Sequence, residues 1–166
     1  MTIWVISDTH FGHENVIRYS GRPFTSAAEM DEAMVARRNA VVQPSDKVYH
    51  LGDLTMRKAG LKVVSRLHGQ KRLIRGNHDI FKTRAYQEAG FPEIHGVRVL
   101  GGCLLSHFPV HPGSLGRYLV NIHGHLHQQP APEGRYLNAC VEWWGYQPVA
   151  LDTLIAGARE RWGSQP

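Results

Sequence analysis

The chain has 166 residues, of which 42% are hydrophobic and 20% charged, a composition typical of one compact globular domain. Its formal charge of +5 favours anionic partners such as nucleotides or nucleic acid, although a solvated basic surface accounts for it equally well. No apolar run approaches the roughly 20 residues of a membrane span, and the N-terminus lacks the pattern of a secretory signal, so we expect a cytoplasmic protein without a membrane partner.

The first half of the chain alternates short apolar strands with helical patterns. Ser26, followed by Glu29 three residues later, forms a capping box that predicts the start of a helix. Met30 and Met34 then lie on one apolar face of that helix. The pattern predicts strands at residues 3–6, 47–51 and 72–74, and helices at residues 26–42, 57–67 and 82–89.

The second half changes character and reads mainly as strands. A hairpin is expected from residues 97–100 and 103–105 around a Gly-Gly turn. Further strands are expected at 118–122 and 135–141, and Asp152 is expected to cap a last helix running to about Arg161. We expect a single domain over residues 1–162 and a frayed tail at 163–166. Strands alternating with helices first, and hairpins later, predict an α/β fold with mixed sheets.

Two cysteines and eleven histidines limit the chemistry. Cys103 and Cys140 are expected to be free, buried thiols, because two cysteines make no disulfide framework. The many histidines suggest metal binding or acid–base chemistry only if their placement supports it.

Metal-binding side chains follow five predicted strands, each at the point where its strand ends. In chain order they are Asp8, His10, Asp53, Asn77, His107, His125 and His127. Because sites in α/β proteins form outside the carboxyl ends of the strands, one shared sheet edge would bring these groups together. Any one of the motifs alone is equally well a loop or a turn. The whole set predicts a metal centre.

The residue types also predict which ions would bind. Four imidazoles, two carboxylates and one amide suit Mn, Fe, Co, Ni or Zn. Seven ligands are too many for one tetrahedral ion, but they suit two ions about 3.5–4 Å apart with a bridging carboxylate. Two divalent ions, two aspartates and a bridging hydroxide leave a charge of about +1, which favours a phosphoester anion.

The motifs resemble the five sequence blocks of the calcineurin-like metallophosphoesterases. These blocks are Asp8-Thr9-His10, Gly52-Asp53, Gly76-Asn77-His78-Asp79, His107 and Gly124-His125-Leu126-His127. The stretch at residues 7–13 is similar to that of small bacterial and phage members. The resemblance implies an α/β sandwich of two mixed sheets flanked by helices in four layers.

The resemblance also implies a ligand set. It assigns Asp8, His10 and His127 to the first ion, Asn77, His107 and His125 to the second, and Asp53 to both. Two Mn2+ ions are expected, with Ni2+, Fe2+, Co2+ or Zn2+ as alternatives. Met56 stands where the family often has Asp or Asn, and Ser106 where it has Gly, but neither departure removes a ligand.

The implied reaction is phosphoester hydrolysis with a metal-bridging hydroxide as the nucleophile. His78 would donate a proton to the leaving oxygen, and Asp79 would hold its imidazole. A structural turn is the alternative for His78.

Three further residues are candidates for substrate binding. His13 is expected on the rim of the site, where it could touch the phosphate, or else as a loop residue. Arg18 and Arg22 could bind phosphate in a bidentate manner, although solvated arginines are the default. The pair Trp143-Trp144 is expected to pack in the core or at an interface rather than stack on bases.

Several functions remain open within this reading. A chain this short carries no large specificity domain, which favours a phosphodiesterase acting on small or nucleotide-like substrates. A phosphomonoesterase, a protein phosphatase and a nuclease are alternatives within the hydrolases. A catalytically silent interaction scaffold would have lost its ligands, whereas all seven are filled here. A histidine-rich metal store would instead show exposed clusters.

Overall fold

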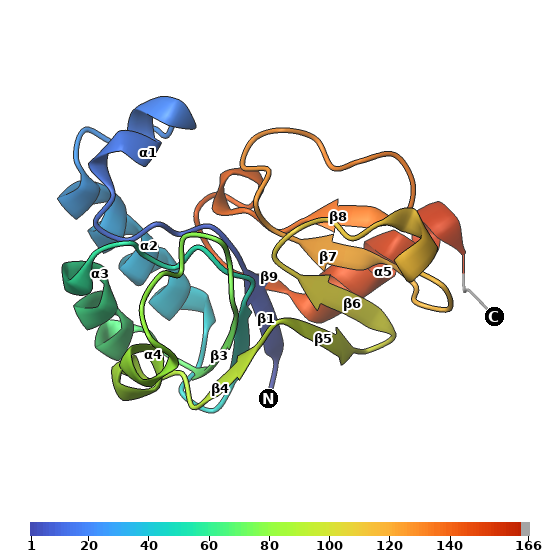
Figure 1. The fold of residues 1–166 in the computed structure, drawn as a ribbon, viewed down its shortest axis with the longest axis horizontal. Coiled ribbons are helices and arrows are strands. Elements are labelled where there is room, and N and C mark those ends of the chain that lie inside the picture. Colours follow the sequence, from blue (N-terminus) through green and yellow to red (C-terminus); the bar gives the residue numbers. More distant parts are fainter. Residues whose placement is uncertain (164–166) are drawn as a thin grey trace.

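The computed structural model describes residues 1–163 and contains two mixed β-sheets flanked by helices (Figure 1), as predicted. The first sheet has the strand order β4-β3-β2-β1-β9 and the second the order β5-β6-β7-β8. The strands of the first sheet are β1 Ile3–Ile6, β2 Lys47–His50, β3 Gln70–Ile74, β4 Glu93–His95 and β9 Val149–Ala150. Those of the second are β5 Val97–Leu100, β6 Cys103–Ser106, β7 Asn121–His123 and β8 Tyr136–Asn138.

Five α-helices accompany the sheets in the described part of the chain. They are α1 Glu14–Tyr19, α2 Ala27–Val41, α3 Lys58–Val63, α4 Thr83–Ala89 and α5 Leu151–Trp162. Figure 1 shows α1 to α4 around the first sheet and α5 against the second. Short 3-10 turns occur at Val64–Arg66, Pro112–Ser114 and Val141–Trp143. No helix among residues 1–163 is long and apolar enough to cross a membrane.

The strands of the first sheet are buried on both faces, which explains their continuous apolar runs. Side chains alternate between the two faces of a strand. In β3, Leu73 therefore packs with Met30 and Met34 of α2 in one core. Its neighbour Ile74 packs with Leu105 of β6 in a second core that the two sheets share. Because of this alternation, one face of the first sheet packs against helices and the other face packs against the second sheet.

The predicted start of α2 is confirmed. The Ser26 side chain accepts a hydrogen bond from the Glu29 backbone N–H at 3.1 Å, and Met30 and Met34 are buried. The Glu29 carboxylate returns to the backbone N–H and hydroxyl of Thr25 rather than to Ser26. The cap therefore includes one more residue than the motif predicted.

Other boundaries differ from the predictions. Ala150 occupies the N-cap of α5, so Asp152 lies in its first turn and the expected Asp152 cap is wrong. Helix α1 and strands β4 and β9 were not predicted, because elements of two to six residues carry too little periodicity. Both cysteines are free and buried, as predicted. Of the expected frayed tail, Gly163 follows α5 as its C-cap, and residues 164–166 lie outside the described residues.

Candidate metal centre

The predicted ligands converge where the two sheets meet. In the first sheet, β1, β2 and β3 run parallel, so their carboxyl ends lie at one edge. In the second sheet, β6 and β7 also run parallel. A backbone bridge between Ser7 and Cys140 joins the loops of the two sheets. The expectation of one shared sheet edge is therefore corrected to two edges that meet.

The loops that carry these side chains adopt an uncommon backbone conformation. Outside glycine, six described residues have a positive φ, and five of them are predicted ligands: Asp8, His10, Asp53, His125 and His127. Such conformations cost about 1–3 kcal/mol each and persist where the surrounding structure enforces them. Their concentration here is typical of a functional site.

Two motif glycines let the loops approach one another. A Cβ atom on Gly124 would lie 2.0 Å from Ser7 Oγ and 2.4 Å from Asp8 Oδ2. A Cβ atom on Gly76 would lie 2.3 Å from Asp53 Oδ1. No side chain fits at these distances, so the glycine before each ligand serves close packing of the loops.

Two groups of side chains in the described residues could each hold a metal ion. One group is Asp8, His10 and His127, and the other is Asp53, His107 and His125. The potential ligand atoms within a group all lie within 4.8 Å of one another. Asn77 extends the second group, since its Oδ1 lies 2.9 Å from His107 Nε2.

Asp53, a member of the second group, also faces the first group. Its Oδ2 is 3.5 Å from His10 Nε2, and its Oδ1 is 3.5 Å from His107 Nε2. Each carboxylate oxygen therefore faces one group, as a bridging ligand requires.

The donor atoms fit divalent cations. Asp8 Oδ1 and His10 Nε2 are buried, lie 3.9 Å apart and have no hydrogen-bond partner among the described residues. Such an orphaned group ordinarily costs about 1–3 kcal/mol. Burial, together with the nearby Arg22 guanidinium, holds the pKa of His10 well below its usual range, so its ring stays neutral. A neutral imidazole beside a carboxylate is the form that binds a metal.

Hydrogen bonds fix the orientation of two ligands. Asp8 Oδ2 accepts hydrogen bonds from Ser7 Oγ at 2.5 Å, the His125 N–H at 2.9 Å and Cys140 Sγ at 3.2 Å, which leaves Oδ1 toward the group. His107 Nδ1 lies 2.9 Å from the Leu51 carbonyl oxygen, so Nδ1 carries the proton and Nε2 is left to ligate.

Arg22 is a buried support beneath the site, not a substrate-binding residue. Only 4% of it is exposed. Its guanidinium donates hydrogen bonds to the carbonyls of Asp8 at 2.7 Å and Thr9 at 2.9 Å, and it pairs with Glu142 at 2.7 Å. The expectation that Arg22 binds phosphate is corrected, because every one of these contacts lies within the protein.

Glu142 is a residue that sequence reasoning missed. Its Oε1 accepts a hydrogen bond from His127 Nδ1 at 2.9 Å, which leaves His127 Nε2 toward the metal group. Burial opposes ionisation of Glu142, but His127 and Arg22 outweigh it and lower the pKa of the carboxyl. No spacing links Glu142 to the five motifs, so only the tertiary structure reveals it.

Asp79 also differs from its expected role. Its carboxylate accepts hydrogen bonds from the backbone N–H groups of Asp53 at 2.8 Å, Leu54 at 3.0 Å and Gly76 at 2.8 Å. It ties two ligand loops together, which corrects the expectation that it holds the His78 imidazole. His78 is anchored instead by its backbone N–H, which donates to Asp53 Oδ1 at 2.9 Å.

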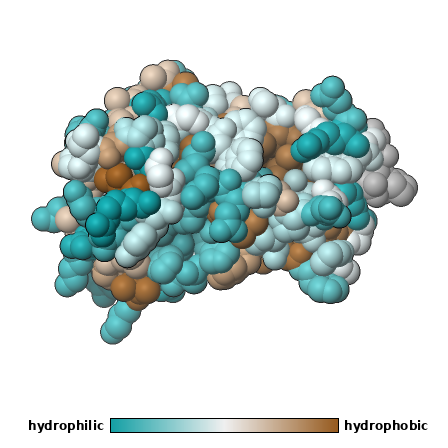
Figure 2. All heavy atoms as spheres, turned by 90° about the horizontal axis from the view of Figure 1, so that it is seen from above, coloured by the Kyte–Doolittle hydropathy of each residue, from teal (hydrophilic) through white to brown (hydrophobic). Residues whose placement is uncertain are grey.

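A cavity of about 320 Å³ opens over the ligand groups. Its lining includes His10, His13, His78, His125 and His127. The predicted rim position of His13 agrees with this placement. Arg18 lies elsewhere, exposed beside Thr25 in a separate hollow, so the structure does not bring it to the metal groups. Seen from above Figure 1, the surface is mainly hydrophilic with scattered apolar patches (Figure 2).

Comparison with known proteins agrees with this fold and site. The model of the calcineurin-like phosphoesterase superfamily domain matches residues 1–139. Uncharacterized protein MJ1445 of Methanocaldococcus jannaschii is 35% identical, over 92% of this chain and 89% of its own length.

Two solved structures have similar folds. The protein of unknown function AQ665 from Aquifex aeolicus has a TM-score of 0.72 and 28% identity, over 92% of this chain and 97% of that one. The Pseudomonas putida nuclease MPE has a TM-score of 0.54 and 22% identity, over 80% of this chain and 65% of that one. With most of its length matched by the family model and both ligand groups in place, the chain belongs to the calcineurin-like phosphoesterase superfamily.

Proposed function

We propose that this protein is a dinuclear metal-dependent hydrolase of phosphoesters, and that it cleaves diesters of small or nucleotide-like compounds. The observation that carries the proposal is the Asp53 carboxylate, whose two oxygens face two separate groups of ligands. Asp8, His10 and His127 would hold one ion, Asn77, His107 and His125 the other, and Asp53 both. Mn2+ is the proposed metal, because imidazole and carboxylate ligands together suit it.

The protein side chains would have separate roles around these ions. Two bound divalent ions would lower the pKa of a water molecule and neutralise charge on the phosphoryl oxygens. Asp53 and Asp8 set the spacing of the site, held by the hydrogen bonds from His78 N–H and Ser7 Oγ. The His78 imidazole lines the cavity, where it can give a proton to the leaving oxygen. His13, on the same wall, can donate a hydrogen bond to a phosphate oxygen.

Hydrolysis assays on metal-stripped protein re-supplied with Mn2+, Ni2+, Co2+, Zn2+ or Mg2+ in turn test the function. We expect bis-p-nitrophenyl phosphate to be cleaved faster than p-nitrophenyl phosphate, with Mn2+ among the active metals. Faster cleavage of the monoester would make the protein a phosphatase. Two tightly bound ions with no hydrolysis of either compound would favour a silent scaffold. A nuclease is a second candidate, because the nuclease MPE shares the fold.

Replacing His78 with Ala is expected to lower kcat about 10²–10⁴-fold while two ions stay bound, because the imidazole acts on the leaving group and not on the metals. Metal content and kcat are measured on the same preparation. The loss should be larger for a diester of phenol than for one of p-nitrophenol, since the poorer leaving group needs the proton more. His111→Ala, a change at an exposed histidine, serves as the control. Equal losses with both leaving groups would remove this role from His78.

A further inference from the structure

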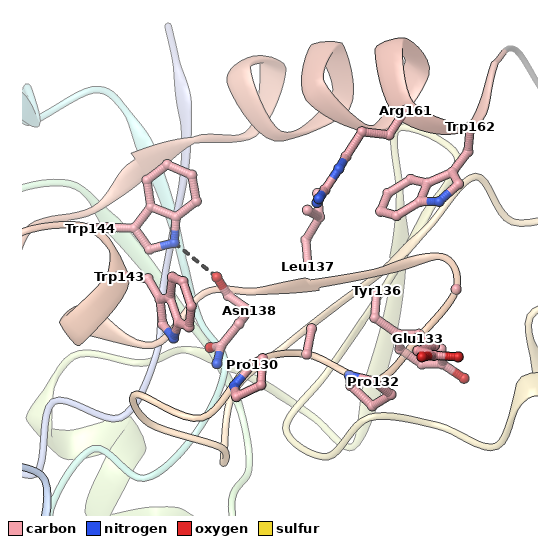
Figure 3. A pocket seen from close by; sticks show the side chains of 12 residues that line it. Pro130, Pro132, Glu133, Tyr136, Leu137, Asn138, Trp143, Trp144, Arg161 and Trp162 are labelled. Carbon is pink, nitrogen blue, oxygen red and sulfur yellow. Dashed lines mark hydrogen bonds between the residues drawn. The ribbon is translucent and has the colours of Figure 1, made fainter.

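A second and larger cavity, of about 710 Å³, begins one residue beyond the metal cavity along the chain. Gln129 lines the metal cavity, and the next residue, Pro130, lines this one. Figure 3 shows Trp143 and Trp144 at one end of it and Trp162 with Arg161 on the α5 side. None of the ligands proposed above lines it.

Two of the three indoles that line this cavity have their N–H groups hydrogen-bonded within the protein, so only their ring surfaces are left to contact a ligand. Trp143 Nε1 donates to the His127 carbonyl at 2.7 Å, and Trp144 Nε1 donates to the Asn138 carbonyl at 2.9 Å. Trp143 is nevertheless 51% exposed. Trp143 therefore does not pack in the core, which was one of the two placements expected for this tryptophan pair. Exposed, rigidly held indole faces are stacking platforms.

Arg161 supplies the one positive charge of the described cavity lining, beside the indoles. The Arg161 guanidinium lies 5.5 Å from the centre of the Trp162 ring, in a cation–π arrangement that keeps a positive charge beside an aromatic face. The chain as a whole carries +5. Glu133 is the one carboxylate of the described lining, and Figure 3 shows it away from Trp143 and Trp144.

The two cavities share a wall. His127 turns its imidazole to the metal cavity, while its carbonyl oxygen holds the Trp143 indole of the second cavity. The three residues from His127 to Pro130 span at most about 11 Å. A ligand that filled both cavities would thus pass over this wall, with a phosphate on one side and a flat ring on the other.

We propose that this cavity binds a nucleobase, and that single-stranded nucleic acid is the substrate class of the neighbouring hydrolytic site. The inference rests on the dinuclear hydrolase proposed above and takes its second candidate function, a nuclease. Because the His127 backbone and the Trp143 indole lie between the cavities, the base that stacks here belongs to a neighbouring nucleotide of the strand, not to the one at the metals. Stacking on indoles is tolerant of sequence, so the subsite accepts all four bases.

The test combines binding and kinetics on the full chain. Anisotropy of a fluorescein-labelled oligothymidylate of about eight nucleotides measures binding with the metals chelated, so that no cleavage occurs. Trp162→Ala and Arg161→Ala are each expected to raise Kd about 5- to 100-fold. Arg159→Ala removes the same charge from an exposed position of α5 outside the cavity and should change Kd far less. Glu133→Gln should tighten binding.

Kinetics on the Mn2+-loaded protein separate the two proposals. The variants should raise KM for the oligonucleotide and leave the turnover of bis-p-nitrophenyl phosphate unchanged, because that compound carries no base. If Arg161→Ala raised Kd for the oligonucleotide no more than Arg159→Ala does, the proposed subsite would be overturned. Arg161 is exposed, so its replacement does not disturb core packing. Competition by thymidine monophosphate as strong as by the strand would overturn the strand assignment. Absence of bis-p-nitrophenyl phosphate cleavage in the unaltered protein counts against the hydrolase alone.

Discussion

Replacing Asp53 with Asn is expected to lower metal-dependent diester hydrolysis by at least about 10²–10³-fold, the scale for losing one group that stabilises a transition state. The amide keeps one oxygen for the His78 N–H but offers no charge between the two ligand groups. The number of ions bound per chain should fall below two. Metal analysis after dialysis, together with kcat for bis-p-nitrophenyl phosphate, measures both effects.

The pH dependence of metal binding provides a second measurement on the same residue. Burial raises the pKa of Asp53 in the metal-free protein, with the nearby Asp8 carboxylate adding to the effect and His107 opposing it. A metal ion binds the ionised carboxylate and competes with the proton, so metal affinity should weaken as the pH falls. Asp152→Asn, at an exposed position of α5, is the matched control and should match the unaltered protein. Two retained ions and full activity in Asp53→Asn would refute the bridging role.

Replacing Arg22 with Met is expected to lower the free energy of unfolding by about 3–5 kcal/mol, the cost of breaking a buried ion pair by removing one partner. The substitution removes the cationic partner of the buried Glu142 carboxylate, which keeps only its hydrogen bond from His127. It also removes the hydrogen-bond donor of the Asp8 and Thr9 carbonyls. Urea unfolding measures the change. Arg18→Met, on the same stretch but exposed, should change stability by less than about 0.5 kcal/mol.

The double variant Arg22→Met/Glu142→Gln tests whether the loss of stability comes from an unpaired buried charge or from lost packing. It should recover part of the lost stability, because the remaining amide carries no charge in a buried place. It should also bind metal more weakly, since His127 loses the carboxylate that orients it. Unchanged stability in Arg22→Met with a raised KM for substrate would restore the phosphate-binding role that the sequence suggested.

Much of the fold could be predicted from local features of the sequence. The start of α2 is determined by Ser26 and by the apolar spacing of Met30 and Met34, all within nine residues of one another. The strands that precede the ligands carry runs of apolar residues because they are buried on two faces. The short elements α1, β4 and β9 have no such signal, and the two strands are stabilised instead by pairing with β3 and β1.

The sequence by itself determined which side chains follow which strands, and it predicted which metals their donor atoms would suit. Only the tertiary structure decided what lies beneath them. Arg22 and Glu142 are 120 residues apart, and Asp79 reaches backbone groups 25 and 26 residues away, so no local pattern reports either contact. Trp143 and Trp162 come together in one cavity for the same reason. Ligand types follow from residue identity, whereas burial, orientation and hydrogen-bond partners depend on how distant segments pack.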